Sequence, residues 1–217
     1  MYFRAWMIKR AALAEHQRAC RACHVCADQG LITEANPTFE GSWGAPFFLI
    51  GQAPGPAERA TRRPFSGRAG KELDRWMLRA GFEDAAEFRR MTYIASLMRC
   101  FPGRNPTNTG DLRPPSTAVA NCAHWLDAEL RLLEPRVIIL VGQMAITRFI
   151  GPGSLEDRVG KSFGKHPVLV PLPHPSGQSR WLNDPLNRDR LTRALRLVGR
   201  LRAKQLKSQT DSAGQKG

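Results

Sequence analysis

The sequence predicts an α/β fold, a three-layer α/β/α sandwich around a four-stranded parallel sheet. Four short apolar runs of strand length alternate with stretches of helical periodicity, which is typical of parallel strands joined by helical crossovers. The run Val137–Val141 is apolar throughout, as strands covered on both faces are. The 217 residues suffice for one domain that buries roughly 70% of its unfolded surface, so it needs no disulfide to fold.

The first half of the chain is expected to hold two of the strands. An amphipathic helix over residues 5–18 lies in an N-terminal segment, 1–19, and a cysteine-rich loop follows it. The other elements expected in this half are a strand at 47–50 ending in Gly51, a loop rich in Gly, Pro and Arg at 51–70, a helix at 71–81, a strand at 91–98 and a polar loop at 101–116.

The second half is expected to alternate in the same way. Its elements are a helix at 117–135, a strand at 136–142, a helix at 143–151, a strand at 167–173, a loop at 174–183 and a helix at 185–206. The main domain therefore spans 20–206, and 207–217 is expected to be a disordered basic tail.

Three of these loops, at 51–70, 101–116 and 174–183, directly follow predicted strands. The carboxyl ends of parallel strands meet at one edge of the sheet, and ligands of open α/β sheets bind outside that edge. The sequence therefore predicts a functional site built from these three loops.

The chain is strongly basic. It has 33 Lys and Arg against 19 Asp and Glu, a net charge of +14. Such a charge attracts polyanions and favours nucleic acid as partner over a merely basic background. No apolar run reaches the roughly 20 residues of a membrane span, and the N-terminus lacks the features of a signal peptide. We expect a cytoplasmic protein without a membrane partner.

The five cysteines argue against a disulfide framework, since their number is odd and the expected compartment is reducing. Three of them lie in the run CRACHVC, where either Cys20 and Cys23 or Cys23 and Cys26 form a C-x2-C pair. Cys100 and Cys122 would complete a set of four thiolates, which zinc and a 4Fe-4S cluster both accept. The wide spacing of the later two favours iron–sulfur, and the alternative is that they are buried small hydrophobes.

Four motifs, taken together and in order, resemble the uracil-DNA glycosylase superfamily, most closely its iron–sulfur families 4 and 5. They are FFLIGQAPG, RRPFSGRAG, TYIASLMRCFPGRNP and PLPHPSG, and the resemblance runs from about residue 23 to about residue 198. It implies that Cys23, Cys26, Cys100 and Cys122 bind a 4Fe-4S cluster, away from the reaction centre, and it makes Cys20 the surplus thiol.

The resemblance also implies two catalytic residues. His174 would donate a hydrogen bond to the leaving base, and Gln52, which stands where family 4 has an acid, would orient a water molecule. The implied substrate-binding residues are Gly51, Ala53, Pro54 and Gly55 of the first motif, Phe65 as the aromatic platform, Ser96 at the base edge and Ser176 at a phosphate. A wedge that fills the space of the flipped nucleotide would come from Arg180, Trp181 and Leu182.

The sequence departs from the family pattern in two ways. Gln52 and Ala53 leave the first motif without a carboxylate, and Glu58 is the nearest acid along the chain. Ser96 aligns with an asparagine that reads the uracil edge, and a serine offers no bidentate fit. Without the carboxylate, the reaction would depend on His174 and backbone amides and be slower. Ser96 suggests either excision of a broader set of deaminated bases or weaker discrimination between bases.

The function that this resemblance implies is hydrolysis of the N-glycosidic bond of uracil, and of other deaminated bases, in DNA by a monomeric enzyme that initiates base excision repair. The first alternative is a non-catalytic protein that binds damaged DNA on the same fold, favoured by the missing carboxylate. The second is a zinc-stabilised nucleic-acid interaction protein.

Overall fold

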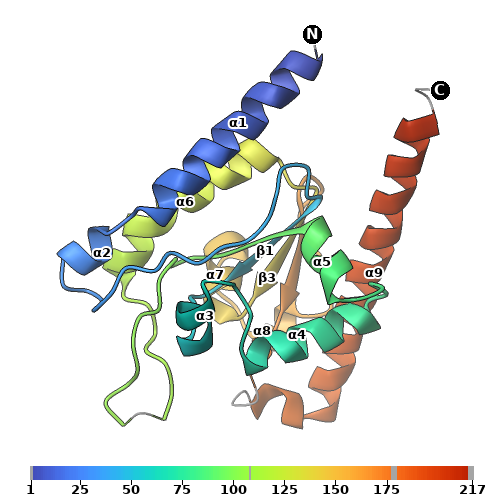
Figure 1. Ribbon diagram of the computed structural model, residues 1–217. Helices are drawn as coiled ribbons and strands as arrows, with labels where there is room; N and C mark the ends of the chain where they lie inside the picture. Colours follow the sequence, from blue (N-terminus) through green and yellow to red (C-terminus); the bar gives the residue numbers. More distant parts are fainter. Residues whose placement is uncertain (1, 108, 177–179, 215–217) are drawn as a thin grey trace.

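The computed structural model describes residues 2–107, 109–176 and 180–214, without the side chains of 2–6 and 209–214. Its centre is a parallel four-stranded sheet in the order β2-β1-β3-β4 (Figure 1). The strands are β1 (Phe47–Gly51), β2 (Thr92–Ser96), β3 (Val137–Val141) and β4 (Val168–Leu172). Helices cover both faces, so the predicted three-layer α/β/α fold is confirmed.

The ten helical segments of the described residues are α1 (Tyr2–Arg21), α2 (Val25–Asp28), α3 (Pro56–Thr61), α4 (Arg68–Arg79), α5 (Ala85–Met91), α6 (Ser116–Leu133), α7 (Gln143–Ile150), α8 (Leu155–Arg158), the 3-10 helix η1 (Arg180–Asn183) and α9 (Pro185–Gly214). None of them combines the length and apolar character that crossing a membrane requires.

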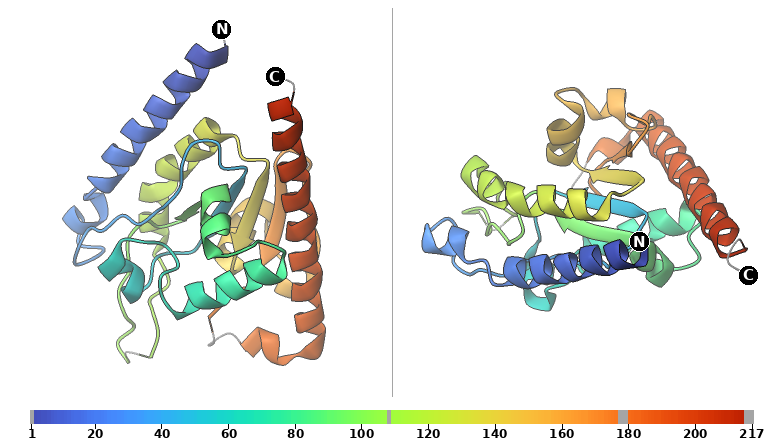
Figure 2. Two further views of the ribbon diagram at one scale, coloured as in Figure 1. Left: turned by 45° about the vertical axis from the view of Figure 1, so that its right-hand side comes forward. Right: turned by 90° about the horizontal axis from the view of Figure 1, so that it is seen from above.

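Alternation along the strands builds the two cores. Phe47 and Leu49 of β1 pack with α4, α5 and α9, whereas Phe48 and Ile50 pack with α1, α6 and α7. Figure 2 shows α9 on one flank of the sheet and the pair α1 and α6 on the other. The residues of β1, β2 and β3 are all buried, which explains why these strands are apolar runs in the sequence.

The two ends of the chain differ from the prediction. Helix α1 is longer than expected and is part of the main domain, because it contacts α6 and buries Leu13 and Cys20. Helix α9 continues to Gly214, where the sequence predicted a disordered tail from residue 207. Residues 207–213 contain neither Pro nor Gly, so nothing in the backbone stops the helix earlier; residues 215–217 lie outside the described residues.

Five helical segments, α2, α3, α5, α8 and η1, lie where the sequence predicted no helix, and the caps of two of them explain why periodicity missed them. The first, α3, lies inside the expected loop at 51–70 and begins at Pro56, a residue whose fixed φ suits the first helical position. The second, α5, is capped by Asp84, whose carboxylate accepts a hydrogen bond from the Glu87 amide. It contains Met91, so β2 is shorter than the predicted strand at 91–98.

Candidate active site

A cleft of about 1070 Å³ opens at the carboxyl edge of the sheet. Its walls come from the loop after β1 together with α3 and the start of α4, from the loop after β2 and from the segment after β4. These are the three loops that the sequence placed at this edge, and the cleft is therefore where the prediction put the functional site.

The last five residues of the first motif line this cleft: Gly51, Gln52, Ala53, Pro54 and Gly55. The motif is tied to the end of β2, because the amides of Leu97 and Met98 donate to the carbonyls of Gly51 (3.0 Å) and Gln52 (3.1 Å). The same turn places Ser96 opposite Gly51 in the cleft wall. The Ser96 hydroxyl donates to the Met98 carbonyl at 2.7 Å, so toward a ligand it offers an acceptor oxygen.

Glu58 links the first motif, FFLIGQAPG, to the second, RRPFSGRAG, by hydrogen bonds; the sequence alone did not place this residue. It lies on α3 and is buried. Its Oε2 accepts from the Gly55 amide (3.0 Å) and its Oε1 from the Gly67 amide (2.9 Å). An acid three residues after a helix N-cap is a known capping pattern, so the sequence contained a signal for this contact.

Phe65 is half-buried in the cleft wall, and its ring packs over Gly51, where an added Cβ would lie 3.4 Å from Cζ. Its φ of 51° is in the left-handed region, which costs a non-glycine residue about 1–3 kcal/mol. Gly70 leaves room for this turn, because a Cβ there would be 1.7 Å from the Phe65 carbonyl oxygen.

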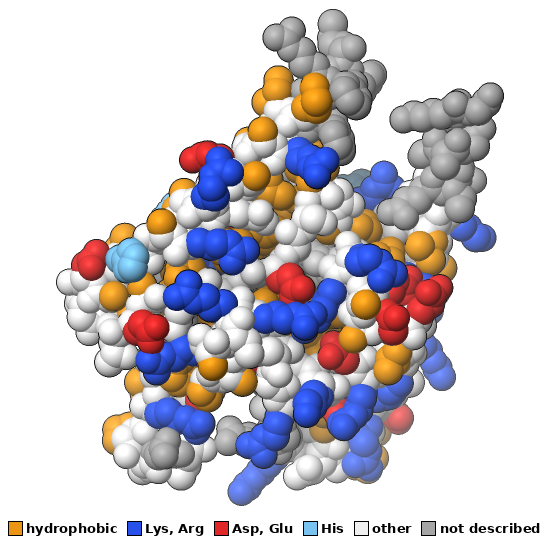
Figure 3. Space-filling model, viewed as in Figure 1, with side chains coloured by type: hydrophobic (Ala, Val, Ile, Leu, Met, Phe, Trp, Pro, Cys, Tyr) orange, Lys and Arg blue, Asp and Glu red, His pale blue; other side chains and the backbone are white. Residues whose placement is uncertain are grey.

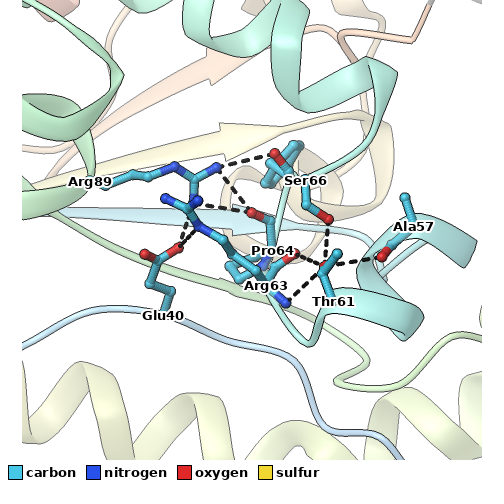
Figure 4. A network of polar contacts seen from close by, with 8 residues as sticks. Glu40, Ala57, Thr61, Arg63, Pro64, Ser66 and Arg89 are labelled. Carbon is cyan, nitrogen blue, oxygen red and sulfur yellow. Dashed lines mark hydrogen bonds and ion pairs between the residues drawn. The ribbon is translucent and has the colours of Figure 1, made fainter.

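Arg89 of α5 holds this strained turn in place. Its guanidinium donates to the carbonyls of Pro64 (3.2 Å) and Phe65 (3.1 Å), and it pairs with Glu40, which also pairs with Arg63 at 3.3 Å. Figure 4 shows Arg89 lying between Glu40 and the turn. The ring of Phe65 is thus positioned by a charged pair that does not line the cleft.

His174 follows β4 and faces Gly142, where an added Cβ would lie 3.6 Å from its Cδ2. Its Nδ1 accepts a hydrogen bond from the Ser176 amide at 3.2 Å. Burial lowers the pKa of His174 below its usual value, against the opposing effect of Glu58 and Asp111. A neutral imidazole that accepts at Nδ1 carries its proton on Nε2, so His174 is a hydrogen-bond donor.

The three residues predicted as a wedge lie on η1, and only Leu182 of them lines the cleft. The indole N–H of Trp181 donates to Glu156, and its carbonyl accepts from Asn187 at 2.9 Å, so Trp181 is fixed to the protein body. Arg180 is exposed. Ser176, the predicted phosphate contact, lines the cleft.

Asp111 is a cleft residue that sequence reasoning missed altogether. It lies on the loop after β2, and no local sequence pattern indicates that it belongs to the site. Burial raises the pKa of Asp111, and Arg104, whose Nε is 3.8 Å from Oδ1, opposes that effect. Arg68 and Arg104 also line the cleft, which gives its rim positive charge.

All five cysteines line one small cavity, which shares no described lining residue with the cleft. Cys20 comes from the end of α1, Cys23 and Cys26 from the next turn and α2, Cys100 from the segment after β2 and Cys122 from α6. Cys20, the predicted surplus thiol, is fully buried at the same cavity. Within the described ranges, no three His, Cys, Asp or Glu side chains are grouped as ligands of a single metal ion.

The surroundings of these thiols fit an anionic, thiolate-bound group. Burial raises the pKa of Cys100 to about 12 and that of Cys122 to about 11, so thiolates here need compensating positive charge. Arg99 lines the cavity and is buried, and its charge lowers the pKa of Cys122. Its Nη2 pairs with Glu129, whereas its Nε and Nη1 have no hydrogen-bond partner among the described residues. The Arg99 amide and the Asn121 side chain already donate to sulfur, at Cys122 (3.5 Å) and Cys26 (3.6 Å).

Comparison with known proteins gives a consistent result. The family model described as the uracil DNA glycosylase superfamily matches residues 39–197. Type-4 uracil-DNA glycosylase from Thermotoga maritima is 28% identical over 138 residues, 64% of this chain and 64% of the relative. The type-4 enzyme of Sulfurisphaera tokodaii is 28% identical over 167 residues, 71% of this chain and 70% of the relative.

A type-5 uracil-DNA glycosylase from Pyrobaculum aerophilum is 35% identical over a shorter stretch of 63 residues, 29% of this chain and 24% of the relative. The match to the Thermotoga relative spans a little less than two thirds of that protein's length.

Proposed function

The chain belongs to the uracil DNA glycosylase superfamily, and on this premise we propose that it hydrolyses the N-glycosidic bond of uracil, and of other deaminated bases, in DNA. The observation that carries the proposal is that Phe65, His174 and the first-motif loop line one cleft, with the Nδ1 of His174 accepting from the Ser176 amide. An aromatic face and a donor aimed at the base are what excision of a flipped nucleotide requires.

The proposed reaction begins with the target nucleotide flipped into the cleft, where Phe65 stacks on the base. As the bond from the sugar to the base breaks, the base gains negative charge, and the Nε2–H of His174 stabilises that charge. Gln52 lines the same cleft and helps to orient the attacking water, but its amide cannot take a proton.

DNA would be held by the basic rim and by Ser176. Lys and Arg predominate over acidic side chains on the face shown in Figure 3. Arg62 and Arg68 are exposed near the cleft, whereas Arg63 already pairs with Glu40. Salt dependence of binding should follow the number of phosphates that these cations neutralise.

The experiment that tests the proposal is single-turnover base release from oligonucleotides that carry uracil, hypoxanthine, xanthine or mismatched thymine, in single and double strands. Abasic product from uracil is the expected result. Binding of the uracil oligonucleotide without release would instead support a non-catalytic damage-binding protein, and release from several bases would follow from Ser96 at the base edge.

Leu182 is the proposed wedge, because it alone of the three predicted residues lines the cleft. Leu182→Ala should slow uracil release from duplex DNA by roughly tenfold and leave release from single strands almost unaffected. Only in a duplex must the nucleotide be unstacked and the space that it leaves be filled by a wedge. Leu186→Ala, an exposed leucine on α9, is the matched control. Equal losses on both substrates would contradict the wedge.

We also propose that Cys23, Cys26, Cys100 and Cys122 hold a 4Fe-4S cluster. The cluster would supply a cross-link between the α1–α2 turn, the segment after β2 and α6. This cross-link would support the cleft, because Met98 lies two residues before Cys100 and its amide holds the Gln52 carbonyl.

Cys100→Ser should therefore abolish the broad visible absorption of the cluster and reduce both solubility and DNA affinity, while Cys20→Ala keeps the absorption. Ultraviolet-visible spectra with iron and zinc analysis make the measurement. A colourless wild-type protein with one zinc would support the zinc alternative, and a folded, active Cys100→Ser variant would refute the supporting role.

A further inference from the structure

We propose that Asp111 supplies the carboxylate that the first motif lacks, by orienting and deprotonating the water that attacks the sugar. The inference deepens the proposed glycosylase function and rests on it. Its starting point is a chemical gap: Gln52 cannot accept a proton, so any general base must come from elsewhere in the cleft.

Three carboxylates line the described part of the cleft, and two of them are already engaged. Both oxygens of Glu58 accept backbone N–H groups. Glu72 accepts from the indole of Trp76 (2.7 Å) and from Arg75 (2.7 Å). Asp111 is different: its Oδ1 is 3.8 Å from the Nε of Arg104, too far for a hydrogen bond, and its Oδ2 has no hydrogen-bond partner among the described residues.

Asp111, on the loop after β2, lies beside the first motif. Its Oδ2 lies 3.3 Å from the position that a Cβ on Gly55 would take, so the carboxylate faces the loop that carries Gln52. Its charge also acts on His174 and Glu58. The carboxylate is therefore close to the two elements of the cleft on which the proposed reaction depends.

The backbone holds Asp111 there. It forms an antiparallel bridge with Arg104, and flanking hydrogen bonds run from the Leu112 amide to Gly103 (2.8 Å) and from the Asn105 amide to Gly110 (2.9 Å). The loop after β2 is thus closed into a hairpin whose paired end presents Asp111. This pairing brings Asp111 back beside Arg104, close to the end of β2, and so gives Asp111 a defined position.

In the proposed step, the water oxygen bonds to C1′ of the sugar while the bond from C1′ to the base nitrogen breaks and its electron pair leaves with the base. The proton of the water passes to Asp111 and then to solvent, and His174 stabilises the anionic base. The groups facing Asp111 are Arg104, Glu58 and His174, so its ionisation depends on all three.

The test is the pH dependence of single-turnover uracil release by the whole 217-residue chain. Asp111→Asn should lower the rate at neutral pH by about tenfold to a hundredfold, the range of a lost general base, without weakening DNA binding, since it removes a negative charge. In the wild type the rate should fall as the pH drops through the pKa of Asp111, because protonation removes the acceptor, and Asp111→Asn should lack this fall.

Two further variants keep the outcomes separate. Asp127→Asn makes the same change of charge on α6, outside the cleft, and should behave as wild type. Arg104→Gln removes the cation that lowers the pKa of Asp111, so the acidic fall should move to higher pH. If Asp111→Asn or Arg104→Gln keeps the wild-type rate and profile, the inference is wrong and the glycosylase function stands. If the wild type releases no base from any substrate, both fall together.

Discussion

Replacing His174 with alanine should lower the single-turnover rate of uracil release by about a hundredfold, the effect of losing one donor to a developing anion. The expectation follows from the Ser176 amide, which donates to Nδ1 and leaves the imidazole proton on Nε2. Burial lowers the pKa of His174, so the imidazole stays neutral at pH 7 and acts as a donor rather than as an acid.

The controls for His174 are chosen to separate chemistry from folding. His124→Ala changes an exposed histidine on α6 and should leave the rate unchanged. His174→Gln retains an N–H donor and should recover part of the rate. A wild-type rate in His174→Ala would show that the leaving base is stabilised by another group.

Phe65→Ala should lower the same rate by more than tenfold, because stacking of a base on an aromatic ring contributes about 1–3 kcal/mol. Phe65→Tyr retains the aromatic face and should remain active. Binding of a uracil oligonucleotide, measured in parallel, should weaken in Phe65→Ala, since the flipped base loses its platform.

A double-mutant comparison of Arg89 and Phe65 tests whether Arg89 acts by positioning the Phe65 ring. If the guanidinium acts by holding the Phe65 turn, Arg89→Ala should slow the wild type several-fold but add almost nothing in a Phe65→Ala background. Residues in one network are non-additive in this way, whereas independent sites add. Additive losses would mean that Arg89 acts on DNA or on the overall fold instead.

The fold was predictable because its signals are local. Buried parallel strands appear as apolar runs, and each of the four predicted runs is a strand in the structure. The short helices α3 and α5 were missed because caps define them rather than hydrophobic periodicity. The segment from residue 207 was predicted to be disordered because it is polar. A polar segment can also continue a helix that projects from the domain, as the end of α9 does (Figure 1).

The part of the site that consists of short sequence motifs could be predicted from the sequence. Phe65, His174 and the first motif are placed together because each follows a strand of one parallel sheet. The contacts that position them link segments far apart: Arg89 and Glu40 are 49 residues apart in the chain. No local pattern reveals such a pair.

The sequence alone therefore determined the α/β/α architecture, the edge where the cleft lies and the residue types that resemble a glycosylase. Only the tertiary structure decided which cleft carboxylate has an oxygen without a hydrogen-bond partner among the described residues, which wedge residue lines the cleft and that Cys20 shares a cavity with the other four thiols. The physical reason is that burial and hydrogen-bond partners are set by segments that meet only in the folded chain, as Asp111 and Gly55 do.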